Sequence, residues 1–265
     1  MSRRRRWFVL ALVGACVLAL FGAAVLARGS GSHPDGVDQR RAGPVLLVPG
    51  YGGSTASLQV LAQALRDEGR DVVLVELPGD GRDDLRDQAR QVQAAADAAL
   101  ARGAPSVDVV GYSAGGVVVR LWAAAGGVSV ARRIVTLGSP HHGTQVAAMG
   151  ATLAPEACPT ACRQLVPGSD LLEGLEETPD GPVWTSVWTA QDETVTPPDT
   201  ARLSGAVNIQ VQRVCPDARV SHGQLPRDPL VLGLVTRALG PAALVAAPTP
   251  AQCDAIRALG IAGRA

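Results

Sequence analysis

Short apolar runs, each bounded by turn residues, alternate with amphipathic stretches over most of the chain. Because the runs are apolar throughout rather than at every second position, they predict strands that are buried on both faces of a sheet. Six such strands are expected, at residues 44–50, 71–77, 106–112, 131–140, 181–192 and 206–214.

Helical periodicity separates most of these strands. In the first such stretch, Leu58, Leu61 and Leu65 recur at helical spacing, and Gly69 follows where a helix would end. Strands separated by helices form a mostly parallel sheet with helices on both faces, so the predicted fold class is α/β. Ligands of such sheets bind at the carboxyl ends of the strands. The predicted helices occupy residues 54–69, 82–103, 114–127 and 229–240.

The N-terminal segment, residues 1–28, has a different pattern. Four arginines precede an unbroken apolar run from Trp7 to Ala27, which is the order of an export signal. The run has the length of about 20 residues that a membrane-spanning helix needs. A retained anchor and a signal peptide cleaved after Val25-Leu26-Ala27 both fit. A lipid-modified Cys16 and a buried core helix fit the flanking residues less well. The export interpretations place the rest of the chain outside the cytoplasm.

Differences in composition divide the rest of the chain into three parts. Residues 29–43, which include His33, form a linker of Gly, Ser, Pro, Asp and Arg. Residues 44–240 carry the predicted strands and helices as one domain, and residues 241–265 form an Ala- and Pro-rich tail expected on the surface. The formal net charge of the 265 residues is zero, and no basic cluster follows the N-terminus, which argues against nucleic acid as a partner.

Four cysteines follow the N-terminal segment. An even number in an exported domain predicts disulfides, and four cysteines allow three pairings. The spacing of Cys158 and Cys162 suits a local bridge, which would leave Cys215 to bind Cys253 and tie the tail to the domain. Zinc is the competing interpretation, but one CxxxC motif without clustered histidines is a weak signal for it.

The segment from Gly111 to Gly115, "GYSAG", lies where the third predicted strand meets the third predicted helix. A sharp turn there would strain the backbone of Ser113 and lift its hydroxyl clear of the sheet, as a nucleophile requires. The two glycines would let strand and helix nearly touch, and the N–H of Ala114 would point to a developing oxyanion. The alternative is a tight turn with an incidental serine.

A serine hydroxyl needs a base within hydrogen-bond reach. His222 follows the last predicted strand, whereas His141 and His142 come too early for the chain order Ser, acid, His. Asp192 stands at the end of the fifth predicted strand, so we expect it to orient the His222 ring, with Glu193 as the second choice. A structural histidine and a solvated turn acid are the alternatives.

The loop after the first predicted strand, "VPGYGGSTASL", is rich in glycine. Gly50, Gly52 and Gly53 would allow the backbone to approach a substrate closely, and the N–H of Tyr51 is the expected second oxyanion donor. Phosphate binding is the alternative, but the loop lacks both the GxGxxG spacing and the lysine of a P-loop.

Five motifs in one order resemble secreted bacterial lipases of the α/β-hydrolase superfamily, above all the small actinobacterial and Bacillus-type enzymes called lipase class 2. They are "LLVPGYGG", "VVGYSAGG", "VTLGSPHHGT", "VWTAQDETVTPP" and "VSHGQLPRDPLV". The resemblance implies a minimal α/β-hydrolase fold with about six strands. The site residues it implies are a catalytic triad of Ser113, Asp192 and His222 and oxyanion N–H groups at Tyr51 and Ala114.

The resemblance also implies that the substrates are lipid or small carboxylic esters and that no metal or organic cofactor is needed. We expect an extracytoplasmic, monomeric lipase or esterase. In such lipases the "SPHHGT" segment lies near the acyl pocket, so His141 or His142 would be structural. A cell-envelope acyltransferase or thioesterase could use the same three residues. A non-enzymatic binding protein is a further alternative, against which the complete Ser, Asp and His set argues.

Two features depart from the family pattern. Many relatives have His-Gly after the first strand, where this chain has Pro49-Gly50, so the conformation of that loop is open. Residues 143–180 are too few for a large helical lid, and their two cysteines would limit its opening. Interfacial activation is therefore not expected.

Overall fold

Residues 37–262 are described by the computed structural model. The expected export or anchor segment, Cys16, His33 and most of the predicted linker lie outside the described residues. Among residues 37–262, no helix combines the length and the apolar character needed to cross a bilayer.

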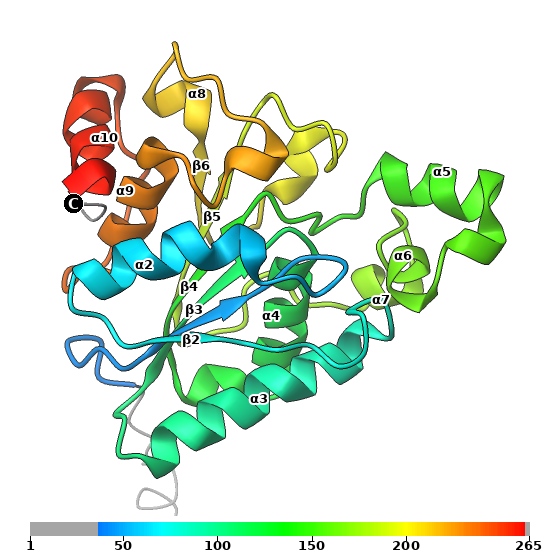
Figure 1. Ribbon diagram of the computed structural model, residues 1–265, viewed down its shortest axis with the longest axis horizontal. Helices are drawn as coiled ribbons and strands as arrows, with labels where there is room; N and C mark the ends of the chain where they lie inside the picture. The colour runs from blue at the N-terminus through cyan, green and yellow to red at the C-terminus, as the bar shows by residue number, and fades with distance from the viewer. Residues whose placement is uncertain (1–36, 263–265) are drawn as a thin grey trace, which may run out of the picture. The chain divides into compact units, whose positions relative to one another are not determined.

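A six-stranded sheet forms the centre of the described chain, with the strand order β2-β1-β3-β4-β5-β6. Every neighbouring pair is parallel, as the buried apolar runs predicted. All carboxyl ends therefore meet at one edge of the sheet (Figure 1). The strands are β1 (Val45–Val48), β2 (Val72–Leu74), β3 (Val107–Tyr112), β4 (Ala131–Leu137), β5 (Val183–Trp188) and β6 (Val207–Gln210).

Helices cover both faces of this sheet (Figure 1). Successive side chains of a strand point to opposite faces, so Leu47 and Val110 join one apolar cluster while Leu46 and Val109 join the other. This double burial is the physical reason for the continuous apolar runs in the sequence. One face packs against α2 (Gln59–Asp67) and α9 (Pro229–Ala238), and the other against α3 (Leu85–Ala101) and α4 (Ala114–Ala124).

Three short helices occupy the segment that follows β4, where no helix was predicted. They lie together beyond the carboxyl ends of the strands (Figure 1). Each has too few turns to give a clear periodicity, and their positions depend on contacts with the domain, such as the bond from the Leu85 N–H to the Gln164 side chain. They are α5 (Gln145–Leu153), α6 (Thr160–Gln164) and α7 (Asp170–Glu173).

The last predicted strand is shorter than expected. β6 ends at Gln210, and the residues that continue its apolar pattern form a helical turn, α8 (Val211–Val214). Val211 and Val214 are both buried in the same core cluster. A spacing of three residues allows this on a helical turn, whereas it would place the two side chains on opposite faces of a strand.

The C-terminal segment is more ordered than the predicted surface tail. It forms α10 (Cys253–Ala262), which packs against α9 (Figure 1). Ile256 of α10 is buried in the core cluster that contains α2 and α9. The prediction of a surface tail rested on the Ala- and Pro-rich composition of this segment, and it missed a helix that packs as part of the domain.

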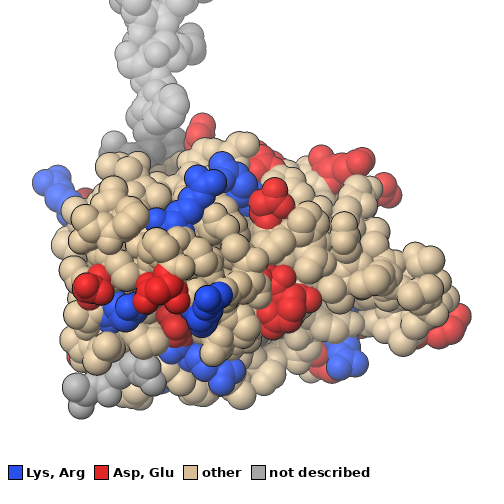
Figure 2. Space-filling model, turned by 90° about the horizontal axis from the view of Figure 1, so that it is seen from above, with Lys and Arg blue, Asp and Glu red and all other residues tan. Residues whose placement is uncertain are grey.

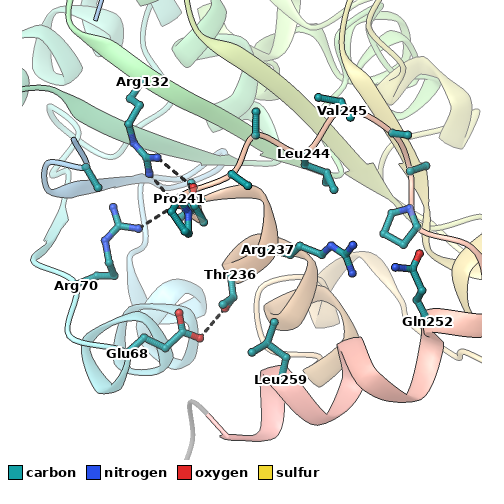
Figure 3. A pocket seen from close by; sticks show the side chains of 18 of the residues that line it. Glu68, Arg70, Arg132, Thr236, Arg237, Pro241, Leu244, Val245, Gln252 and Leu259 are labelled. Atoms are coloured by element: carbon teal, nitrogen blue, oxygen red, sulfur yellow. Dashed lines mark hydrogen bonds between the residues drawn. The ribbon is translucent and has the colours of Figure 1, made fainter. Parts of the chain in front are cut away.

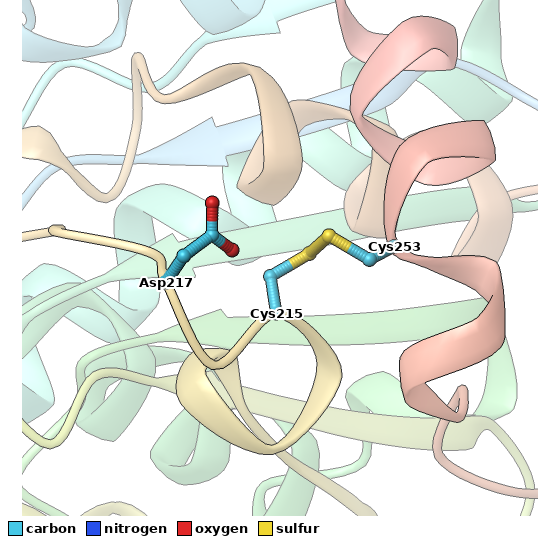
Figure 4. A group of neighbouring side chains, drawn as sticks. All are labelled: Cys215, Asp217 and Cys253. Carbon is cyan, nitrogen blue, oxygen red and sulfur yellow. A yellow bond between two sulfur atoms is a disulfide. The ribbon is translucent and has the colours of Figure 1, made fainter.

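Two disulfides join the four cysteines of the described chain. They are Cys158–Cys162 and Cys215–Cys253, which is the pairing that the spacing favoured. Cys215 directly follows α8, and Cys253 is the first residue of α10. The second bridge therefore attaches the C-terminal helix to the segment that follows β6 and α8 (Figure 4). The disulfide interpretation is confirmed over the zinc alternative for these four residues.

A buried ion pair ties the amino ends of the central strands. Asp108 and Arg132 are both fully buried, and Arg132 Nε lies 2.9 Å from Asp108 Oδ1. Arg132 also donates to the carbonyl of Leu239, at the end of α9, so the pair links two strands to the helix layer. Both charges have hydrogen-bond partners, as burial requires.

Candidate active site

Ser113 stands between β3 and α4 in a strained turn. Its φ of +54° is the only positive value for a residue other than glycine among residues 37–262. Such a conformation costs of order 1–3 kcal/mol and persists only where the surroundings impose it. Here its N–H donates to the carbonyl of Leu137 on the neighbouring strand. The elbow predicted from "GYSAG" is therefore present.

Close backbone contacts explain the glycines of this turn. A Cβ on Gly111 would lie 2.6 Å from Gly116 Cα, and a Cβ on Gly115 would lie 2.4 Å from the carbonyl oxygen of Pro49. Real Cβ atoms do not approach other atoms so closely. Strand and helix nearly touch on both sides of Ser113, as predicted, so larger side chains would displace it.

The structure brings Ser113, His222 and Asp192 into one hydrogen-bonded chain. His222 Nε2 lies 3.0 Å from Ser113 Oγ, and His222 Nδ1 lies 2.8 Å from Asp192 Oδ2. All three side chains are at least nine-tenths buried. The serine follows β3 and the aspartate follows β5, so the geometry depends on the parallel sheet that aligns those two strand ends.

The carboxylate of Asp192 is held on both of its oxygens. Oδ2 accepts from the His222 ring, while Oδ1 accepts from the backbone N–H groups of Thr194 at 2.9 Å and Val195 at 2.7 Å. The second choice, Glu193, lies elsewhere: its Oε2 accepts from the backbone N–H of His222 at 3.2 Å and does not contact the ring nitrogens. The geometry thus favours Asp192 over Glu193.

The two expected oxyanion donors lie on either side of Ser113. Ala114 is the first residue of α4, and the loop that carries Tyr51 approaches Ser113 so closely that a Cβ on Gly50 would lie 2.9 Å from Ser113 Cβ. Among the described residues, neither the Tyr51 nor the Ala114 N–H has a backbone acceptor. Both N–H groups are thus free to bind a ligand.

The other two histidines of the described chain bond elsewhere. His141 is buried, with Nε2 3.0 Å from Thr136 Oγ1. Burial, with a smaller contribution from the nearby positive charge of Arg120, holds the pKa of His141 well below its usual value, so its ring stays neutral. His142 is exposed and lies 2.8 Å from a carboxylate oxygen of Glu177. Both ring nitrogens of His142 and Nε2 of His141 therefore bond away from Ser113, while His141 Nδ1 has no hydrogen-bond partner among residues 37–262.

Tyr112 is a neighbour of the site that sequence reasoning missed. Its hydroxyl donates to the backbone carbonyl of His222 at 3.2 Å, and the two rings lie 5.2 Å apart. Burial, followed by the negative charge of Asp192, raises the pKa of Tyr112 to about 12. Its position directly before Ser113 was visible in the sequence, but its contact with the distant His222 loop was not.

A large pocket of the described chain lies away from these residues. It measures about 860 Å³ and lies between the end of α9, the loop after it and α10 (Figure 3). Arg132, at the start of β4, contributes to its wall, whereas Ser113 follows the end of β3. The pocket therefore opens at the amino edge of the sheet, opposite the candidate active site.

Charged side chains and possible metal ligands of the described chain also lie outside the candidate active site. Basic and acidic side chains are interspersed on the face shown in Figure 2, in keeping with the zero net charge. The one cluster with metal-ligand atoms close together among residues 37–262 is Cys215, Asp217 and Cys253. Its two sulfurs form a disulfide and Asp217 contacts Arg257, so the thiolates that a metal would bind are absent (Figure 4).

Comparisons with known proteins identify the fold. The sequence profile of the alpha/beta hydrolase fold family matches residues 43–155, which include Ser113 but neither Asp192 nor His222. No curated protein matches the sequence significantly.

Solved structures give a wider match. Aspergillus fumigatus lipase B has a TM-score of 0.62 at 18% sequence identity, over 86% of this chain and 63% of that protein, so the chain spans less than two thirds of it. The mature form of the Bacillus licheniformis lipase BlEst2 has a TM-score of 0.62 at 19% identity, over 78% of this chain and 94% of that one. MGS-MChE2, an alpha/beta hydrolase enzyme from a metagenome of sediments of the lagoon of Mar Chica, Morocco, has a TM-score of 0.52 at 16% identity, over 74% and 91%. At these identities the likeness concerns the fold.

Proposed function

We propose that this chain, which has the α/β-hydrolase fold, is a serine hydrolase that cleaves carboxylic esters through an acyl-enzyme. The observation that carries the proposal is the hydrogen-bonded chain from Asp192 through His222 to Ser113, whose backbone is strained. This arrangement matches the roles of a nucleophile, its base and the acid that orients the base.

In the proposed reaction, Ser113 Oγ attacks the ester carbonyl carbon while His222 Nε2 takes the serine proton. The carbonyl electron pair moves to the oxygen, where the N–H groups of Tyr51 and Ala114 stabilise the negative charge. When the carbonyl re-forms, the bond to the alcohol breaks and His222 returns the proton to the leaving oxygen. Water then attacks the acyl-enzyme by the same steps and releases the acid. Asp192 stabilises the imidazolium in both halves.

The substrate class is proposed as lipid or small esters. Support comes from two similar structures, both of enzymes called lipases, and from the five sequence motifs that resemble lipases of the class 2 type. The two disulfides support action outside the cytoplasm, because disulfides persist in oxidising compartments.

Ester turnover tests the proposal. Wild type should hydrolyse p-nitrophenyl esters, while Ser113→Ala should lose at least about 10⁴-fold in kcat. Ser139→Ala is the matched control, because it removes another buried hydroxyl that has no hydrogen-bond partner among residues 37–262. We expect it to retain turnover within about threefold. Equal turnover by wild type and Ser113→Ala would exclude the proposed function.

The same assay separates hydrolase from acyltransferase. With an alcohol such as glycerol present, a hydrolase releases mainly the free acid, whereas a transferase forms mainly the new ester. We expect the free acid to dominate.

A further inference from the structure

The turn after Asp192 binds Oδ1, the carboxylate oxygen that does not contact His222. Oδ1 accepts from two successive backbone N–H groups, those of Thr194 and Val195. Asp192 can therefore keep its other oxygen on His222 only while this turn keeps its shape. Residues that fix the turn control the orientation of the carboxylate.

Thr144, in the loop after β4, binds this turn from outside. Its hydroxyl donates to the carbonyl of Thr194 at 2.8 Å and accepts from the N–H of Thr196 at 3.1 Å. It also accepts from the N–H of Val146 at 3.3 Å, at the start of α5. A hydroxyl has one hydrogen and two lone pairs, so these three bonds use all of its capacity. Thr144 is buried, which makes each bond costly to lose.

The bond to Thr194 acts directly on an Asp192 donor. The carbonyl of Thr194 and the N–H of Val195 belong to the same peptide group, which is planar. When Thr144 fixes the direction of that carbonyl, it also fixes the opposite N–H, which points to Asp192 Oδ1. The hydrogen-bonded chain thus extends from Thr144 through one peptide plane to Asp192, His222 and Ser113.

We propose that Thr144 is a positioning residue, which aims the Val195 N–H at Asp192 and so holds the carboxylate in place for His222. The inference rests on the proposed function, because it assigns Thr144 a part in the same reaction. Thr144 lies behind Asp192 in this chain of contacts, so its effect falls on the catalytic step rather than on substrate binding.

Replacement of Thr144 by Val tests this role, since Val keeps the shape and removes the hydroxyl. We expect Thr144→Val to lower kcat about 10- to 100-fold with KM changed less than about twofold. Thr144→Ser keeps the hydroxyl and should recover kcat to within about threefold. Thr152→Val is the matched control, because among residues 37–262 the Thr152 hydroxyl bonds only within α5, to the carbonyl of Ala148.

A double-mutant cycle with Asp192→Asn tests whether Thr144 positions Asp192 or only caps the start of α5. If Thr144 acts through Asp192, Thr144→Val should lower the residual kcat of Asp192→Asn less than about threefold. Equal losses in the two backgrounds would overturn the proposal, as would a wild-type kcat in Thr144→Val. Should Thr144→Val fail to fold cooperatively, Thr144→Ala replaces it, because it leaves room for water to bind the three backbone groups.

The proposed function and this inference fail in different ways. Full turnover in Ser113→Ala would overturn the function whatever Thr144 does. An inactive Ser113→Ala together with a fully active Thr144→Val would overturn only the role of Thr144.

Discussion

Tyr112 donates its hydroxyl hydrogen to the backbone carbonyl of His222 at 3.2 Å, across 110 positions of the chain. Tyr112 is the last residue of β3, and His222 begins a short 3-10 helix in the loop before α9. The bond therefore attaches the loop of the proposed base to the strand that carries the proposed nucleophile. It stabilises the relative position of two groups that must act together.

Removal of this hydroxyl should reduce stability in a pH-dependent way. At about pH 8, Tyr112→Phe should lower the free energy of unfolding by about 1 kcal/mol. The folded pKa of about 12 exceeds the unfolded value of 10.0, so the stability linked to Tyr112 ionisation is complete below pH 10.0 and is lost as pH rises through about 12. Wild type should lose up to about 1.4 kcal/mol per pH unit in that window through this group, and Tyr112→Phe should lack that component. Urea unfolding from about pH 8 to about pH 11 measures both; a difference that stays constant over this range would contradict the expectation.

A methyl group at Gly138 should disrupt the proposed triad. Gly138 has a φ of +54°, and a Cβ there would lie 3.2 Å from both Asp192 Oδ2 and His222 Nδ1. We expect Gly138→Ala to lower kcat/KM at least about 10-fold, because small displacements of reacting groups are costly. Gly223→Ala is the control, since a Cβ there meets nothing within 4 Å although it adjoins His222. Similar kinetics in the two variants would show that the contact at Gly138 is unimportant.

His141 should make the protein less stable in acid. The buried ring resists protonation in the folded state, whereas in the unfolded chain it takes up a proton near the ordinary histidine pKa of 6.5. The unfolded state therefore binds more protons below pH 6.5, and the free energy of unfolding should fall with decreasing pH. This group can contribute up to about 1.4 kcal/mol per pH unit. His141→Gln should have a shallower slope than wild type in urea unfolding between about pH 4 and pH 7, and an unchanged slope would count against a neutral buried ring.

The two disulfides should differ in their effect on stability. Cys215 and Cys253 are 38 positions apart, while Cys158 and Cys162 are 4 apart. Loop-closure entropy predicts losses of about 4 and about 2 kcal/mol when the respective pairs are replaced by serine. Denaturant unfolding of the two double variants measures the order. A larger loss for the Cys158 and Cys162 pair would contradict it.

The sequence predicted the sheet because each strand carries its own signal. β1 is apolar at every position, and β3 has one charged residue, Asp108, whose charge pairs with Arg132; the bounds of both strands lie within the predicted ranges. Ser113 and Asp192 could be proposed for the same reason, since each follows the end of a strand, whereas His222 lies in the loop after the helical turn α8. Local pattern and the order of elements are sufficient for such residues.

Other features depend on contacts between distant segments. The pattern of residues 206–214 fits a strand, but the core takes up Val211 and Val214 from one side of a helical turn. The role proposed for Thr144 depends on two loops that meet only in the folded domain. The Tyr112 bond to His222 is of the same kind. No local pattern in the sequence predicts any of these contacts.

Reaction with a fluorophosphonate tests the proposed nucleophile most directly. Such a reagent forms a covalent adduct with a serine that a neighbouring base activates. Mass spectrometry of the labelled protein should place the phosphonate on Ser113, and labelling should be lost in His222→Ala. An adduct on another residue, or labelling of His222→Ala at the wild-type rate, would contradict the assignment of Ser113 and His222 as nucleophile and base.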